Sequence, residues 1–143
     1  MSAEPAPPAP TGFQKAGVDV GLVVDDLPAM AAFYTDVLGL VRGAERTTGW
    51  GTMVELHAGE SVVRLLRPPA GPERRDAPMA GVTGVRYLTL PVPDLEARLA
   101  RAEAAEAPVT VPLTRVRDVA FAMVADPEGN VVEFLQRGGE GTA

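Results

Sequence analysis

The sequence has 143 residues, which is the length of one domain and too short for two independent cores. Hydrophobic residues make up 46% of the chain and charged residues 22%, a composition typical of a globular protein and not of a disordered one. The formal net charge of −6 and the lack of a basic run argue against nucleic-acid binding, and the absence of cysteine excludes disulfides, thiolate nucleophiles and cysteine-bound zinc.

The two ends of the chain are expected to lie outside the folded domain. Residues 1–14 are rich in proline and predict a disordered arm, and residues 138–143 predict a flexible tail. The arm lacks the basic-then-apolar order of a secretory signal, and no run approaches the ~18 apolar residues that a spanning helix needs. We therefore expect a cytoplasmic protein with no membrane partner and a domain over residues 15–137.

The first half of this domain has the pattern of a strand, a helix and three further strands. Alternating apolar residues from Val20 to Val24 predict the first strand. After Asp26, which suits an N-cap, apolar residues recur three and four positions apart through Leu38, and this predicts a helix that stops at Gly39. Three more strands are predicted at residues 41–48, 52–57 and 61–66.

A proline-rich segment at residues 68–80 carries both signs of charge and no apolar period, so it predicts a linker between two modules. The first module then covers about residues 15–67 and the second about residues 81–137. The run from Leu88 to Leu95 repeats the pattern of the first strand and helix start at an offset of 68 residues.

The second module repeats the order of the first. A helix is predicted from Leu95 to Ala105, followed by strands at residues 109–116, 119–125 and 130–135. The turn before the last strand, Asp-Pro-Glu-Gly-Asn at 126–130, has proline where φ is near −65° and glycine where φ is positive. Each module is then βαβββ, and we expect an α+β fold with a curved mixed sheet around a cup and the helices outside.

Two motifs carry a family resemblance. The first is Asp-Leu-x5-Phe-Tyr-x3-Leu-Gly-Leu at residues 26–40, and the second is Asp-Pro-Glu-Gly-Asn-x2-Glu-Phe at residues 126–134. With these motifs the chain resembles the vicinal oxygen chelate superfamily, the glyoxalase-like group of glyoxalase I, bleomycin-resistance proteins and extradiol dioxygenases, over about residues 17–137. The resemblance implies the fold given above. It implies less about function, because that superfamily uses one cup for several reactions and for plain binding.

The resemblance also implies where a metal would be bound. Metal-using members generally place a histidine on the first strand and a glutamate on the last strand of each module, and the corresponding positions here are Asp19, Arg64, Tyr87 and Glu133. Only Glu133 matches, and a guanidinium has no free lone pair for a cation. We therefore expect no metal cofactor. The alternative is a divalent ion such as Zn, Ni, Mn or Fe held by Glu133 and Asp19.

The same positions suit a metal-free ligand site. Arg64 could bind a ligand, or it could pair with Asp19 or Glu133 and serve the structure alone, while Tyr87 could donate a hydrogen bond. Glu133 and Asp19 are the candidate catalytic residues, as groups that transfer a proton.

Three further residues are expected at the cup. Trp50 stands between two glycines, and it is either a lid over an apolar ligand or the cap of a hairpin. Met53 and Met123 lie on predicted strands and are expected to line the cup.

Three functions are compatible with these residues. The favoured one is a protein of the bleomycin-resistance type that binds and sequesters a small, apolar or aromatic molecule without a metal. The others are a metal-dependent glyoxalase or dioxygenase, and a metal-independent lyase, isomerase or cyclase with a carboxylate base. Small two-module members of the superfamily commonly dimerise, so the resemblance implies a homodimer, and the linker is long enough for two chains to exchange modules.

Overall fold

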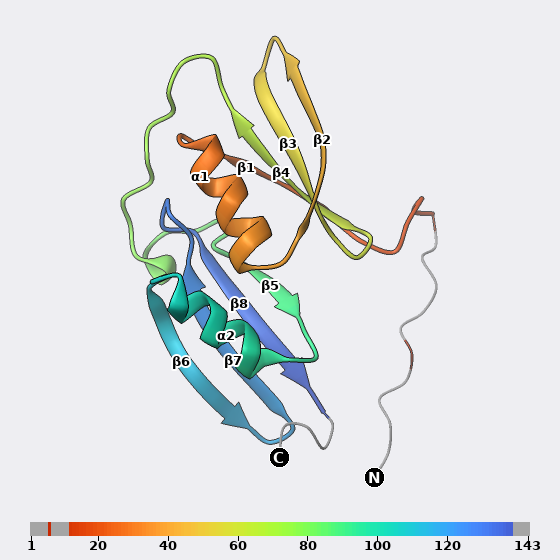
Figure 1. Ribbon diagram of the computed structural model, residues 1–143, viewed down its shortest axis with the longest axis vertical. Coiled ribbons are helices and arrows are strands. Elements are labelled where there is room, and N and C mark those ends of the chain that lie inside the picture. Colours follow the sequence, from red (N-terminus) through yellow and green to blue (C-terminus); the bar gives the residue numbers. More distant parts are fainter. Residues whose placement is uncertain (1–5, 7–11, 139–143) are drawn as a thin grey trace.

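The computed structural model describes residue 6 and residues 12–138, and its elements follow the order β-α-β-β-β twice (Figure 1). The elements of the first module are β1 (Asp19–Val23), α1 (Leu27–Ala32), η1 (Phe33–Val37), β2 (Val41–Thr48), β3 (Gly51–Ala58) and β4 (Ser61–Arg67). Those of the second are β5 (Tyr87–Pro91), α2 (Leu95–Ala104), β6 (Val109–Val116), β7 (Val119–Ala125) and β8 (Val131–Arg137). Of the predicted arm and tail, residues 1–5, 7–11 and 139–143 lie outside the described part of the chain.

Each module forms its own four-stranded mixed sheet. The strand order is β1-β4-β3-β2 in the first sheet and β5-β8-β7-β6 in the second. In both, the first strand pairs in parallel with the last, and the other neighbours are antiparallel. The matching orders confirm the predicted α+β fold of two βαβββ modules. They also leave β1 and β5 as sheet edges, since no ladder joins the two sheets within the described residues.

The predicted first helix is one element with two geometries. Asp26 accepts a hydrogen bond from the Ala29 N–H, as expected of the N-cap, and α1 begins at Leu27. From Phe33 the chain continues as the π-helical segment η1, in which the Leu38 N–H donates to the Phe33 carbonyl. The sequence period did not distinguish this wider turn from the α-helix that precedes it.

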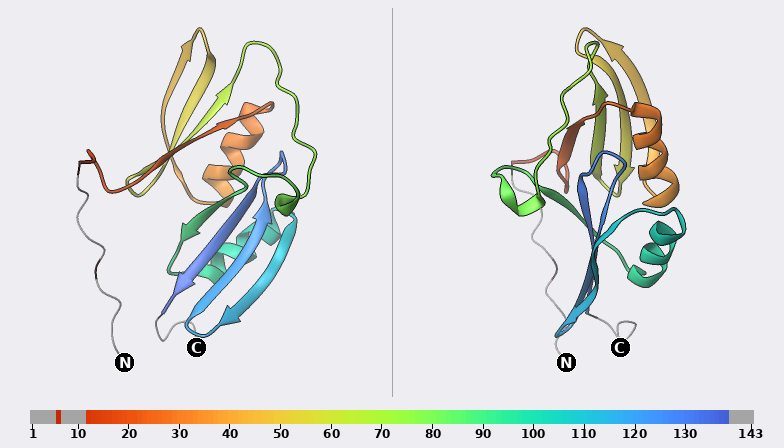
Figure 2. Two further views of the ribbon diagram at one scale, coloured as in Figure 1. Left: turned by 180° about the vertical axis from the view of Figure 1, so that it is seen from behind. Right: turned by 90° about the vertical axis from the view of Figure 1, so that its left-hand side faces the viewer.

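The core lies between the helices and one face of each sheet. Both α-helices are on the same side of the sheets, and no α-helix covers the opposite faces in the described part of the chain (Figure 2). The largest fully buried side chains come mainly from α1, η1, α2 and the inward positions of the strands, among them Met30, Tyr34, Leu65 and Phe134. Burying each such side chain contributes roughly 1.5–3 kcal/mol, so this layer fixes which strand faces stay open.

The segment between the modules contains only one short helical turn. It runs from Pro68 to Arg86 and includes the 3-10 turn η2 (Met79–Gly81). The segment and η2 lie on the side of the sheets away from α1 and α2 (Figure 2, right). No helix in the described residues is both long enough and apolar enough to span a membrane.

The turn between β7 and β8 connects the second module to the first. The Tyr34 hydroxyl donates to Asp126 Oδ2 at 2.8 Å, and Asp126 is only 3% exposed. The Glu128 carboxylate accepts from the backbone N–H groups of Asp25 and Asp26, at distances of 2.9 and 2.7 Å. The motif at 126–130 is therefore more than a turn, because its carboxylates hold the end of β1 and the helix that follows.

The Tyr34 hydroxyl makes the stability of the fold depend on pH in the alkaline range. Burial, with the neighbouring Asp126 carboxylate, raises the pKa of Tyr34 well above its usual value. Tyr34 therefore ionises less readily in the folded than in the unfolded chain. Its contribution to the free energy of unfolding is fully present below pH ~10 and is lost as the pH rises above that value.

Tyr34→Phe is expected to be about 1–2 kcal/mol less stable than the wild type at neutral pH, because Asp126 loses a buried donor. The difference should narrow above pH ~10, since phenylalanine does not ionise. Urea unfolding followed by circular dichroism at neutral pH and at pH ~11 measures both free energies. If both proteins lost the same free energy of unfolding between neutral pH and pH ~11, this role for the hydroxyl would be contradicted.

Candidate functional site

A cavity of about 690 Å³ lies where β1, β5 and the segment between the modules meet. Its walls come from four stretches of chain: residues 18–25, 72–79, 85–88 and 128–131. The first and last of these are the stretches that the Glu128 carboxylate binds together. The contact between the modules therefore also shapes one side of the cavity.

The walls combine apolar and charged side chains. Some of the apolar ones are half-buried or buried, such as Leu22, Met79 and Val131, while others, such as Val23 and Val85, are exposed. The charged ones come mainly from the segment between the modules, and they include Glu73, Arg74, Arg75 and Arg86. Gly21 also lines the cavity, and a Cβ added there would meet no atom within 4 Å.

The structure places two of the predicted site residues in this cavity. Asp19 and Tyr87 line it, from β1 and β5 respectively. Arg64 and Glu133 lie one strand further into each sheet and do not line it, although Arg64 contacts Asp19. Trp50, Met53 and Met123 also lie outside the cavity lining.

Asp19 and Arg64 belong to an ion network on the open face of the first sheet. Arg64 Nη1 lies 3.0 Å from Asp19 Oδ2, and Arg64 Nε lies 3.3 Å from Glu55 Oε2. The Lys15 ammonium contacts the other oxygen of Asp19. The hydrogen bond from Lys15, with that from Arg64, lowers the pKa of the Asp19 carboxyl. Asp19 is therefore held as a carboxylate whose two oxygens both face cations.

Lys15 and Glu55 were missed in the sequence analysis. Glu55 could have been found, because Ala58 pairs with Ser61 across a two-residue turn and this register places Glu55 opposite Arg64. Lys15 precedes β1, and no periodicity there indicates the direction of its side chain.

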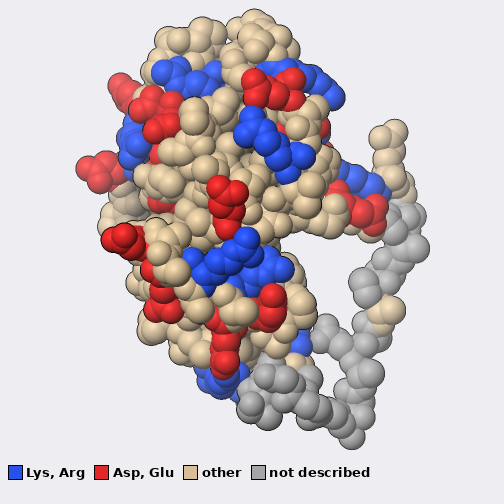
Figure 3. Space-filling model, in the orientation of Figure 1, with Lys and Arg blue, Asp and Glu red and all other residues tan. Residues whose placement is uncertain are grey.

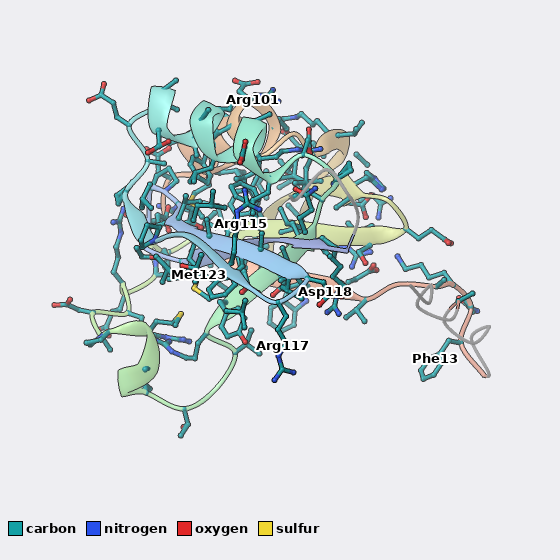
Figure 4. All side chains as sticks on the ribbon, turned by 90° about the horizontal axis from the view of Figure 1, so that it is seen from below. Phe13, Arg101, Arg115, Arg117, Asp118 and Met123 are labelled. Atoms are coloured by element: carbon teal, nitrogen blue, oxygen red, sulfur yellow. The ribbon has the colours of Figure 1, made fainter. Side chains whose placement is uncertain are left out.

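Glu133 has a separate environment on the second sheet. Thr89 Oγ1 donates to Glu133 Oε1 at 2.7 Å, and Met123 is its neighbour on β7. Figure 4 shows Met123 on the sheet face opposite the helices. Among the described residues, no hydrogen bond or ion pair joins Glu133 to Arg64, and Tyr87 donates to neither.

Trp50 occupies the turn between β2 and β3 and is 79% exposed. Its backbone N–H donates to the Thr48 hydroxyl, which closes the turn. Of the two roles left open by the sequence, this position agrees with a hairpin cap. Elsewhere on the surface, acidic and basic side chains alternate over the helical face, which carries no extended patch of one sign (Figure 3).

Comparison with known proteins places the chain in a family. Residues 18–134 match the Glyoxalase/Bleomycin resistance protein/Dioxygenase superfamily. The chain belongs to this superfamily. No curated protein matches its sequence.

Solved structures of the superfamily show the same two modules. A lactoylglutathione lyase from Agrobacterium tumefaciens is 25% identical, with a TM-score of 0.63 over 88% of this chain and 96% of that one. A glyoxalase family protein from Bacillus cereus is 17% identical, with a TM-score of 0.76 over 92% and 99%. TnmS3, an antibiotic-binding protein from Streptomyces sp. CB03234, is 20% identical, with a TM-score of 0.69 over 90% and 99%.

The residues of this glyoxalase-superfamily chain do not fit the divalent metal that the resemblance implies. No group of three or more His, Cys, Asp or Glu among the described residues could hold a metal ion. At the first module's position, the Arg64 guanidinium is bound to Asp19 and Glu55, and it brings positive charge where a cation would sit. Glu133 remains as a single carboxylate with one hydroxyl partner, which is too few ligands for such a site.

Proposed function

We propose that this superfamily member binds a small, apolar or aromatic molecule in the cavity between β1, β5 and the linking segment, without a metal, and acts by sequestering or carrying it. The cavity carries the proposal. Its volume of about 690 Å³ falls within the roughly 300–1,000 Å³ typical of small-molecule sites. TnmS3 provides a precedent for antibiotic binding by a protein of this fold.

The charge state of Asp19 supports binding over proton transfer. A general base works best when its pKa lies near the operating pH. The cations of Lys15 and Arg64 move the pKa of Asp19 the other way, and they occupy both of its oxygens. Asp19 therefore contributes a fixed and neutralised charge to the cavity wall, and it is a weak proton acceptor.

A larger side chain at Gly21, which would fill part of the cavity, tests the proposal. Phenyl-naphthylamine, a neutral aromatic fluorophore, should bind the wild type, and Gly21→Leu should weaken its binding by about tenfold or more because the new side chain occupies the space. The melting temperature should not fall, since the added Cβ meets no atom within 4 Å and the rest of the side chain extends into the cavity. Fluorescence titration and thermal melting measure the two quantities.

Gly49→Leu is the matched control. Gly49 lies in the turn before β3, outside the cavity lining, and it also has no atom within 4 Å of an added Cβ. Its affinity for the fluorophore should equal that of the wild type. Equal affinities in all three proteins would rule out this cavity as the binding site.

We also expect the protein to form a two-fold homodimer. The edge strands β1 and β5 are unpaired on one side in the described chain and expose apolar side chains, with Val23 58% and Tyr87 49% exposed. Such edges are usually covered in soluble proteins. Light scattering at micromolar concentration should give twice the monomer mass, and a monomer mass would contradict the dimer.

A further inference from the structure

Three guanidinium groups on the cavity wall have no acidic partner in the described part of the chain. Arg74, Arg75 and Arg86 all line the cavity. None of them lies within 4 Å of an Asp or Glu oxygen among the described residues, in contrast to Arg64 and Arg67 nearby. The segment between the modules therefore brings unneutralised positive charge to one side of the site.

Backbone carbonyls orient two of these arginines without cancelling their charge. Arg86 Nε donates to the Met79 carbonyl at 2.8 Å, and Arg86 Nη2 donates to the Pro78 carbonyl at 3.0 Å. Arg75 Nη1 donates to the Val85 carbonyl at 3.4 Å. These bonds use only some of the N–H donors of each guanidinium group, so other N–H groups remain for a further acceptor.

Most carboxylates that line the cavity already have an ion-pair or hydrogen-bond partner. Asp19 belongs to the ion network with Arg64, and Asp25 faces Arg67 at 3.7 Å. Glu128 accepts the backbone N–H groups at the end of β1. Glu73 is the one lining carboxylate that has no hydrogen bond or ion pair among the described residues. Counted over the described lining residues, the charges without an ion-pair partner are thus three guanidinium groups and one carboxylate.

Apolar side chains line the same cavity as this charge. Val23 and Tyr87 lie on the exposed faces of β1 and β5, and the segment that carries the arginines lies on that side of the sheets (Figure 2). A ligand that fills the cavity would contact both kinds of side chain at once. Guanidinium groups bind carboxylate, sulfonate and phosphate oxygens with paired hydrogen bonds, whereas a neutral ligand would leave them unneutralised.

We infer that the ligand is an apolar or aromatic molecule that carries one anionic group, and that Arg74, Arg75 and Arg86 bind that group. This inference rests on the proposed function, because it names the chemical class of the molecule that the cavity takes. Selection is then electrostatic as well as steric, and neutral analogues of the ligand bind more weakly.

Two fluorophores with one skeleton test the inference. Anilinonaphthalene sulfonate is anionic, and phenyl-naphthylamine lacks the sulfonate. The wild type should bind the anion more tightly, and Arg74→Gln/Arg75→Gln should weaken anion binding about tenfold while the neutral compound changes less than about twofold. Salt at 0.5 M should reduce the preference in the wild type through screening. Arg86 is left in place because it holds η2.

Arg101→Gln is the control for net charge. Arg101 lies on α2, on the side of the sheets opposite η2 (Figure 4), and it does not line the cavity. Its removal should leave the affinity for both fluorophores unchanged. If the double variant binds the anion like the wild type, or if Arg101→Gln weakens it equally, the anion inference is wrong while binding in the cavity stands. If the wild type binds neither fluorophore, the proposed function and this inference are both wrong.

Discussion

Asp126→Ala should lower the free energy of unfolding by about 3–5 kcal/mol, since it leaves several buried donors without an acceptor at once. Asp126 Oδ1 accepts from the backbone N–H groups of Glu128 and Asn130, each at 2.9 Å. Oδ2 accepts from the Tyr34 hydroxyl at 2.8 Å and the Asn130 amide at 2.9 Å. A loss of this size is a large part of the ~5–15 kcal/mol that holds a domain folded.

Two variants separate this network from a general effect of charge. Asp126→Asn keeps one oxygen for the backbone donors and should cost less than the alanine variant. Asp76→Ala removes an exposed carboxylate with no hydrogen bond or ion pair among the described residues, and it should change stability by less than ~0.5 kcal/mol. Urea unfolding measures all three, and equal stability of Asp126→Ala and Asp76→Ala would mean that the turn does not depend on the carboxylate.

The fold was predictable because its signals are local. Alternation in the strands, the three-and-four spacing from Asp26 to Leu38, and the repeat at an offset of 68 residues all follow from which face of an element is buried. The observed last strand begins at Val131, one residue later than predicted. The reason is that Asn130 closes the turn through a backbone bond to Asp126.

The candidate site was predictable only within one sheet. Strand parity places Asp19 and Arg64 on the same open face, and they form an ion pair there. Whether Arg64 also reaches Glu133 depends on how the two sheets are placed, and Tyr34, Glu128 and Asp126 determine that placement through contacts about 100 residues apart in the chain. Periodicity carries no information about such contacts.

The charged wall of the cavity was not predictable for a different reason. Arg74 and Arg75 lie in a segment without apolar period, so the sequence gives no direction for their side chains. The carbonyls of Val85, Pro78 and Met79, which bind Arg75 and Arg86, provide that direction only after the segment has folded over β1 and β5.

The two glycines that flank Trp50 should respond to alanine in opposite ways. A Cβ added at Gly51 would lie 2.1 Å from the Arg67 carbonyl oxygen and 2.8 Å from Pro68 Cα, and the Gly51 φ is +128°. Because both contacts are to backbone, the end of β4 would have to move away from β3. We expect Gly51→Ala to cost about 3 kcal/mol or more, through this overlap and the strained φ together.

Gly49→Ala should be nearly neutral, since its added Cβ meets no atom within 4 Å. Circular dichroism during thermal and urea unfolding measures both variants, because Trp50 is already 79% exposed in the folded chain and its fluorescence would report unfolding weakly. A large loss confined to Gly51→Ala would show that this glycine lets β4 approach β3, and is not a hinge for a tryptophan lid. Equal stability of the two variants would show instead that the end of β4 moves freely, and the turn that carries Trp50 would then have the mobility that a lid requires.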